Sequence, residues 1–185
     1  MVHDGGSLIV TGFELGERHH RTNINQLIYH FGVSFNSDVV VRPKAEFSGG
    51  ERSKDYDTTL LYEGILDQAH PLFRDVHAVA MRNACSLHLE PGALPLLLVH
   101  PNQIRELSMI SARYSEEGGF SVLASGDQLF QEPYEDPKRV IAALAPKDLT
   151  GRGKVLALGT WDFQSDGRRS DNEQFVVNLW YWLVS

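Results

Sequence analysis

Short apolar runs bounded by glycine, proline and polar turns predict most of the strands of this chain. The first run, residues 7–11 (SLIVT), lies between glycines and has the pattern of a strand that is buried on both faces. A second strand is predicted at residues 39–41 and ends before Pro43. Further strands are predicted at residues 76–81, 86–90, 94–99, 120–124, 140–145 and 154–159.

Two segments have the periodicity of helices. Residues 22–31 place one apolar face at i, i+3, i+4 and i+7, formed by Ile24, Leu27, Ile28 and Phe31. Thr22 or Asn23 is expected to cap this helix, and Gly32 supplies the left-handed residue that ends it.

The second helix is predicted from residue 171 to about residue 184. Ser170 and Glu173 have the spacing of a capping box at its start. Its inner face consists of Phe175, Leu179, Trp182 and Leu183, and Val176 and Trp180 form a second apolar strip. A helix that is apolar on nearly all sides is usually covered on more than one of them.

The remaining segments complete a single domain, residues 1–185. Residues 44–75 are polar and irregular, and they predict a surface excursion with one short helix near residues 60–68. Residues 76–125 predict a β-rich insertion. The order strand, helix, strands, helix indicates an α/β fold with an antiparallel insertion.

Charge and cysteine content exclude several functional classes. The net charge of −7 gives no general attraction to nucleic acid or to an anionic membrane, so no nucleic-acid partner is expected. Cys85 is the only cysteine, which excludes an internal disulfide and a cysteine-based zinc site. The first residues have no signal-peptide pattern, and no apolar run reaches membrane-spanning length. A soluble cytoplasmic protein is therefore predicted.

Two groups of segments resemble a known family. The first is residues 5–10 (GGSLIV), followed by residues 23–27 (NINQL) and 31–36 (FGVSFN). The second is residues 151–159 (GRGKVLALG), followed by Asp162, Phe163, Asn172, Phe175, Asn178 and Leu179. The chain resembles the GIFT-type domain of intraflagellar-transport and bacterial gliding proteins, a branch of the class I glutamine amidotransferase-like fold. The resemblance implies a Rossmann- or flavodoxin-like sheet.

The resemblance also implies an incomplete sheet. Proteins similar to this one have further strands and a helix before the GGSL segment, and we expect these usual N-terminal strands to be lacking here. Either the sequence is a fragment of a longer protein, or another polypeptide supplies the missing part of the sheet. An open sheet edge is a site for unwanted association, so a second polypeptide or a copy of this chain is expected to cover it.

An amidotransferase-like catalytic set is not predicted. Enzymes of that fold need a cysteine on a glycine-flanked turn together with a histidine that an acid orients. Cys85 has no neighbouring glycine, and alternation along a strand places it on the face opposite His88 and Glu90. We therefore predict a buried structural cysteine and a chain that is not an enzyme.

Other catalytic and cofactor motifs are also lacking in the sequence. It contains no G-x-S-x-G elbow, no G-x-G-x-x-G and no Walker loop, and its histidines are scattered. No cofactor and no metal are therefore expected.

Two loops follow predicted strands at the sheet end where ligands of open α/β sheets bind. The first contains Arg18, His19, His20 and Arg21 before the helix that begins near Asn23, which suits an anion or an acidic partner surface. The second places Trp161 and Phe163 on either side of Asp162, with Asn172 at the next helix start. Aromatic and amide groups suit a sugar ring, and carbohydrate binding has been suggested for domains that resemble this one. The alternatives are a solvated basic loop and aromatic residues that anchor the last helix.

Three functional hypotheses follow. The leading one is a non-catalytic interaction domain that forms part of a larger assembly, with another polypeptide or a copy of itself as partner. The second is a carbohydrate- or anion-binding sensor module that uses the two loops. The third is a divergent hydrolase, which requires Cys85, His88 or Asp162 to lie within hydrogen-bond reach of one another.

Overall fold

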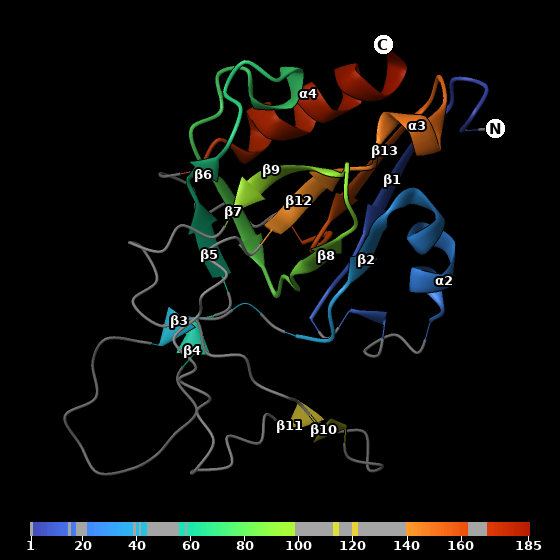
Figure 1. The fold of residues 1–185 in the computed structure, drawn as a ribbon. Coiled ribbons are helices and arrows are strands. Elements are labelled where there is room, and N and C mark those ends of the chain that lie inside the picture. Colours follow the sequence, from blue (N-terminus) through green and yellow to red (C-terminus); the bar gives the residue numbers. More distant parts are fainter. Residues whose placement is uncertain are drawn as a thin grey trace, which may run out of the picture.

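The structure is a computed structural model that describes residues 2–14, 16–17, 22–38, 40, 42–43, 56–57, 59–98, 113–114, 120–121, 140–162 and 170–185. Within these residues, a mixed sheet carries the short helix α2 (Ile24–Ile28) and the long helix α4 (Asn172–Val184) (Figure 1).

The main sheet has the strand order β1-β13-β12-β8-β2, so β1 is an edge strand of the described sheet. These strands are β1 (Ser7–Thr11), β2 (Val33–Phe35), β8 (Leu87–Leu89), β12 (Val140–Leu144) and β13 (Lys154–Leu158). Two more strands extend it, because β9 (Leu94–Leu98) pairs with β12 and β6 (Gly64–Ile65) pairs with β9. The pairing of β1 with β13 is parallel, and the other described pairings are antiparallel.

Smaller elements surround this sheet. The antiparallel pairs are β3 (Arg42–Pro43) with β4 (Tyr56–Asp57), β5 (Thr59–Tyr62) with β7 (Val79–Arg82), and β10 (Arg113–Tyr114) with β11 (Phe120–Ser121). The short helices are η1 (Tyr29–Phe31), η2 (Pro71–Phe73) and α3 (Lys147–Thr150).

Strand alternation divides the core into two clusters, one on each face of the sheet. On β13, Leu156 and Leu158 join the cluster that contains the inner face of α4, and Ala157 joins the cluster that contains Ile28 of α2. Successive strand residues point to opposite faces, so a strand covered on both faces must be apolar throughout. Residues 155–158 are all buried, which explains their unbroken apolar sequence.

Most predicted strands are present within the described residues. β8, β9, β12 and β13 lie within the predicted ranges, and β7 overlaps the one predicted at residues 76–81. β1 covers residues 7–11 as predicted, and both of its faces pack against core clusters, Ile9 on one side and Leu8 with Val10 on the other. The burial is partial, since Val10 is buried, Thr11 is exposed and the rest are half-buried.

The first helix is shorter than predicted. The α-helix ends at Ile28 and continues as the 3₁₀ turn η1 to Phe31, where Gly32 has the predicted left-handed φ of 69°. Asn23 is the N-terminal cap residue, but its side chain makes no capping hydrogen bond. Ile28 is fully buried, whereas Leu27 is 53% exposed and does not belong to the buried face.

Three local predictions are wrong or fall partly outside the described residues. Residues 60–68 form β5 and β6 instead of a helix, because Leu60 and Tyr62 alternate inward while the segment pairs with β7. Of the strand predicted at residues 39–41, only Val40 is described; it is buried and belongs to no strand. Of residues 120–124, only the two residues of β11 are described.

The last helix begins as predicted, but with a different cap. Asp171 is the cap residue and makes no side-chain capping bond, so the predicted box of Ser170 and Glu173 is wrong. The Asp171 carboxylate instead accepts the backbone N–H groups of His77 (2.6 Å) and Ala78 (3.2 Å). The start of α4 is therefore fixed to the segment before β7 and not to its own first turn.

The fold is mixed α/β, as predicted. A Rossmann-like sheet would be mainly parallel, and here one described pairing is parallel, so the Rossmann- or amidotransferase-like assignment stays a prediction. The described part of the predicted β-rich insertion supplies β8 and β9 to the main sheet itself. The single-domain extent of residues 1–185 also stays a prediction.

Candidate functional site

The side chain of Asn172, a predicted site residue, is buried and makes hydrogen bonds within the fold. It is 5% exposed, its Oδ1 accepts the backbone N–H of Ala80 at 2.8 Å, and its Nδ2 donates to the Ala80 carbonyl at 2.8 Å. A side-chain amide can replace a neighbouring strand in this way, because it offers one donor and one acceptor side by side. Asn172 therefore connects α4 to β7.

Asn25 makes the same double contact on the other face of the sheet. Its Nδ2 donates to the Phe35 carbonyl at 2.9 Å, and its Oδ1 accepts the Phe35 N–H at 2.8 Å. Asn178 also bonds to backbone, since its Nδ2 donates to the carbonyls of Leu72 and Arg74. These three asparagines, all within the segments that carry the family resemblance, secure helices to the rest of the fold.

A buried polar pair lies next to the cysteine. Asp38 is 2% exposed, and its carboxylate accepts the Ser86 backbone N–H at 2.7 Å and the Ser86 hydroxyl at 2.5 Å. Asn36 donates to the same hydroxyl oxygen at 2.9 Å. Sequence reasoning missed this group, because Ser86 lies far along the chain from Asn36 and Asp38 and no motif joins them.

Cys85 is buried, as predicted, and does not meet His88. The Cys85 thiol donates to the Gly159 carbonyl at 3.3 Å, and burial together with the nearby Asp38 carboxylate raises its pKa to about 12. His88 is exposed and lies 3.5 Å from Glu90. The thiol is therefore protonated at neutral pH and has a backbone carbonyl as its hydrogen-bond partner, which is unsuited to a nucleophile.

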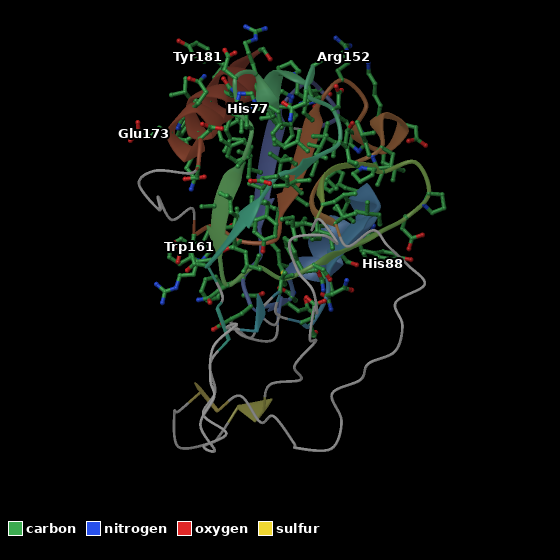
Figure 2. The ribbon with its side chains drawn as sticks, turned by 90° about the vertical axis from the view of Figure 1, so that its left-hand side faces the viewer. His77, His88, Arg152, Trp161, Glu173 and Tyr181 are labelled. Atoms are coloured by element: carbon green, nitrogen blue, oxygen red, sulfur yellow. The ribbon has the colours of Figure 1, made fainter. Side chains whose placement is uncertain are left out.

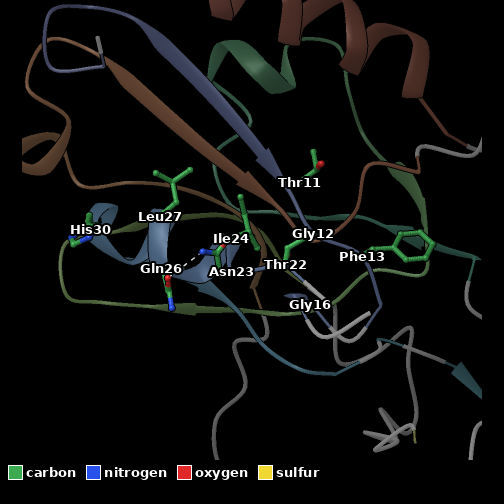
Figure 3. Close-up of a pocket in the computed structure, with 10 residues that line it drawn as sticks. All are labelled: Thr11, Gly12, Phe13, Gly16, Thr22, Asn23, Ile24, Gln26, Leu27 and His30. Carbon is green, nitrogen blue, oxygen red and sulfur yellow. Dashed lines mark hydrogen bonds between the residues drawn. The ribbon is translucent and has the colours of Figure 1, made fainter. Parts of the chain in front are cut away.

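A pocket of about 710 Å³ lies where β1 ends and α2 begins, the strand end at which the sequence predicts a ligand. It is lined by Thr11, Gly12, Phe13, Gly16, Thr22, Asn23, Ile24, Gln26, Leu27 and His30 (Figure 3). Figure 3 shows Gln26 and Leu27 of α2 and His30 of η1 on one side and Phe13 at the opposite end of the lining. Among the predicted site residues that the structure describes, Asn23 is the one in this lining, and its Nδ2 donates to Gln26 at 3.2 Å.

Phe13, which lines this pocket, belongs to an aromatic pair. Phe13 follows β1, Trp161 follows the parallel neighbour β13, and their rings stack with centroids 5.7 Å apart and planes at 21°. Trp161 is 58% exposed. We call these two residues the aromatic platform. Parallel strands end at the same sheet edge, which is why loops far apart in sequence meet here.

The backbone groups of Asp162 make two hydrogen bonds that fix its position. Its N–H donates to the Thr160 hydroxyl, and its carbonyl accepts the Arg82 N–H, both at 3.0 Å. Asp162 and Trp161 do not line the pocket that contains Asn23. Asn172 bonds to Ala80 and Asp162 to Arg82, so both of these described residues of the predicted second site are fixed to β7.

The start of α2 already has an anionic group. Glu17 Oε2 accepts the backbone N–H of Asn25 at 3.1 Å. A carboxylate in this position satisfies the partial positive charge that an external anion would use. Arg18, His19, His20, Arg21 and Phe163 lie outside the described residues.

Two searches of the described residues complete the site description. They contain no group of three or more His, Cys, Asp or Glu side chains placed to hold a metal ion. None of their helices combines the length and the apolar character needed to cross a membrane.

Comparison with known proteins points to one family model and to similar solved structures. Residues 1–69 match the family model described as the IFT52 GIFT domain. Among solved structures, the chain is similar to the "mmIFT52 N-terminal domain" at 21% identity and a TM-score of 0.61, over 100% of this chain and 67% of that one. No curated protein matches the sequence. The family match and the structural likeness agree with the resemblance drawn from the sequence.

Proposed function

We propose that this chain, which carries a GIFT-type domain, acts as a non-catalytic assembly component of an intraflagellar-transport complex. The observation that carries the proposal is the exposed aromatic platform beside an open pocket. In the same molecule, the Cys85 thiol and the Asn172 side-chain amide make hydrogen bonds to backbone groups of the chain itself.

The surface chemistry around the pocket supports a polypeptide partner. Trp161 and Leu27 are 58% and 53% exposed, and amide side chains of Asn23 and Gln26 lie between apolar ones. Apolar and aromatic anchors ringed by neutral polar groups are the composition of protein-binding surfaces. A pocket beside a rigid stacked ring pair can receive an apolar side chain of another subunit.

The open edge of β1 supports the same proposal. β1 pairs with β13 on one side, and Leu8 and Ile9 are only half-buried. An edge strand presents unpaired N–H and C=O groups that a strand of another polypeptide, or of a copy, can bind. The cytoplasmic location predicted from the sequence fits a component of this kind.

A carbohydrate- or anion-binding module remains the second candidate. The exposed ring of Trp161 favours a sugar, because sugar rings stack on aromatic faces. An anion is disfavoured at the start of α2, where the Glu17 carboxylate already accepts an N–H group.

The test is affinity purification of the full chain from its own cells, with the co-purifying polypeptides identified by mass spectrometry. The platform variant Phe13→Ser/Trp161→Ser is compared with Leu94→Ser, an exposed apolar residue of β9 outside the pocket lining. We expect wild type and Leu94→Ser to retain intraflagellar-transport subunits and the platform variant to lose them.

Two results would overturn the proposal. One is retention of the same partners by the platform variant. The other is a partner-free chain whose tryptophan fluorescence responds to sugars and no longer responds after Trp161→Ser, which would establish the carbohydrate module instead.

A further inference from the structure

The outer edge of β1 presents unpaired backbone groups within the part of the chain that the structure describes. Two bonds fix which residues face β13: the Gly6 carbonyl accepts an N–H of β13 at 3.1 Å, and the Gly12 N–H donates to a carbonyl of β13 at 2.7 Å. In a parallel pair, residues that bond to one neighbour alternate with residues whose N–H and C=O groups point away from it. The even-numbered residues of β1 therefore bond to β13, and the N–H and C=O groups of Ser7, Ile9 and Thr11 point to the open edge.

This edge is partly shielded from water. Ser7, Leu8 and Ile9 are half-buried, and Thr11 is exposed. Figure 2 shows α4 and α2 on opposite sides of β1, the dark blue strand. Ile9 packs against the core cluster that contains the inner face of α4, and Leu8 packs against the cluster that α2 joins. Backbone polar groups that are shielded from water without a partner are unfavourable, so the edge of β1 is suited to a further strand.

The surroundings of the edge specify the chemistry of that strand. A strand added to β1 continues the sheet, so its successive side chains extend the two faces in turn. Both faces are apolar at this position, because Ile9 shares its cluster with Leu183 of α4 and Leu8 shares its cluster with Ile24 of α2. The added strand must therefore be apolar at successive positions, as β1 itself is, and a strand that alternates apolar and charged residues does not fit.

The edge of β1 is continuous with the pocket next to the aromatic platform. Thr11, the last residue of β1, presents its backbone groups to the edge and also lines the pocket. The exposed Leu27 of α2 lines the same pocket, and none of the described lining residues is Lys, Arg, Asp or Glu. A segment that lies along β1 therefore reaches the pocket directly, and both surfaces suit uncharged, apolar residues of the same partner.

We propose that an extended, uncharged segment of another subunit adds to β1 as a further strand, with its backbone bonded to Ser7, Ile9 and Thr11. Its apolar side chains continue both core clusters. The segment spans about five residues, or about 17 Å, which is the length of β1. This inference rests on the proposed function, since the partner is another subunit of the assembly, and it adds the conformation, the length and the apolar composition of the partner segment.

Hydrogen exchange at single-residue resolution tests the pairing. It compares the purified full chain alone with the complex that co-purifies from its own cells. In the chain alone, the amides of Leu8 and Val10 should exchange slowly because they bond to β13, and those of Ile9 and Thr11 should exchange fast. In the complex, the Ile9 and Thr11 amides should slow at least about tenfold, since a bonded amide exchanges only when its hydrogen bond opens.

A proline at residue 7 blocks the edge while leaving the bonds to β13 in place. Ser7 is the first residue of β1, a position where proline is tolerated, and Ser7→Pro removes an N–H group that points to the open edge. The variant should retain about fivefold less partner in the affinity purification, the effect of one lost hydrogen bond. Ser7→Ala keeps the N–H group, so it is the matched control and should retain as much partner as wild type. Circular dichroism checks that both variants are folded.

The outcomes separate this inference from its alternatives and from the proposed function. Slow exchange of the Ile9 and Thr11 amides in the chain alone would overturn it, since residues of the same chain, or of a second copy where the chain is dimeric, would then cover the edge. Fast exchange of both amides in the complex would also overturn it, and the proposed function would stand if the platform variant loses its partners. A platform variant that keeps its partners, in a complex with slow Ile9 and Thr11 amides, would overturn the platform and leave this inference standing. A chain that purifies without any partner would overturn both.

Discussion

Replacing Asn172 by alanine tests whether this asparagine holds the fold or binds a ligand. The substitution removes the two hydrogen bonds to Ala80, both 2.8 Å long. Ala80 is 1% exposed, so water cannot take the place of the lost amide. The variant therefore leaves one backbone N–H and one C=O of β7 buried without partners.

The magnitude follows from those two groups. Each buried unsatisfied polar group costs about 1–3 kcal/mol, so Asn172→Ala should lower the free energy of unfolding by about 2–6 kcal/mol. That is a large share of the stability of a typical domain, which is about 5–15 kcal/mol. With a urea m-value of about 2 kcal/mol/M, the unfolding midpoint should fall by about 1–3 M.

Asn23→Ala is the matched control, because the sequence marks both asparagines as site candidates. The Asn23 side chain makes one exposed hydrogen bond, to Gln26 at 3.2 Å. Its removal should change the free energy of unfolding by at most about 0.5 kcal/mol. Urea unfolding followed by circular dichroism measures both variants. Equal stability of Asn172→Ala and wild type, together with loss of partner binding, would refute the structural role of Asn172.

Three further substitutions and labels test the interior. The Cys85 thiol, whose pKa is raised to about 12, stays protonated from neutral pH up to that value. It should therefore react with iodoacetamide at pH 8 only after unfolding, and rapid labelling of the native chain would contradict this. Gly159→Ala should lower the unfolding midpoint sharply or prevent folding, because the Cβ of the new alanine would collide with the Cys85 backbone carbonyl oxygen. A variant with wild-type thermal stability would contradict this and would show that β13 can shift there. Tyr62→Phe should leave the stability equal or raise it by about 1 kcal/mol, since the buried Tyr62 hydroxyl has no hydrogen-bond partner in the described part of the chain; a loss of more than about 1 kcal/mol in urea unfolding would contradict this.

The strands of the core were predictable because their environment is simple. Residues 155–158 are buried on both faces, and such a strand requires an unbroken apolar run that can be read directly. α4 was predictable from its inner face at helical spacing. The local sequence pattern is sufficient to predict an element whose pattern of burial is the same along its whole length.

Predictions failed where a tertiary contact decided the outcome. Residues 59–62 contain apolar side chains that fit either a helix or a strand, and pairing with β7 selects the strand. The three-residue strand β2 was missed, although its Val-Ser-Phe alternation directly after Gly32 is a usable signal. The cap of α4 failed because Asp171 bonds to residues 77 and 78, far away in sequence.

The candidate site was predictable in position and not in composition. Both loops lie at the expected end of β1 and β13, because that follows from strand order alone. The stacking of Phe13 on Trp161 depends on the parallel register of the two strands, which no motif in either loop encodes. Asn172 bonds to the backbone of Ala80, and the sequence could not reveal this contact because a buried amide and a ligand-binding amide have the same sequence signature.

The most direct test of the account is the native mass of the chain's complex in extracts of its own cells, measured for wild type and for Phe13→Ser/Trp161→Ser. The account predicts a large complex with intraflagellar-transport subunits for wild type. It predicts a fall to the free chain for the platform variant. A platform variant that keeps the full mass of the complex would contradict the central claim that this aromatic surface binds the assembly.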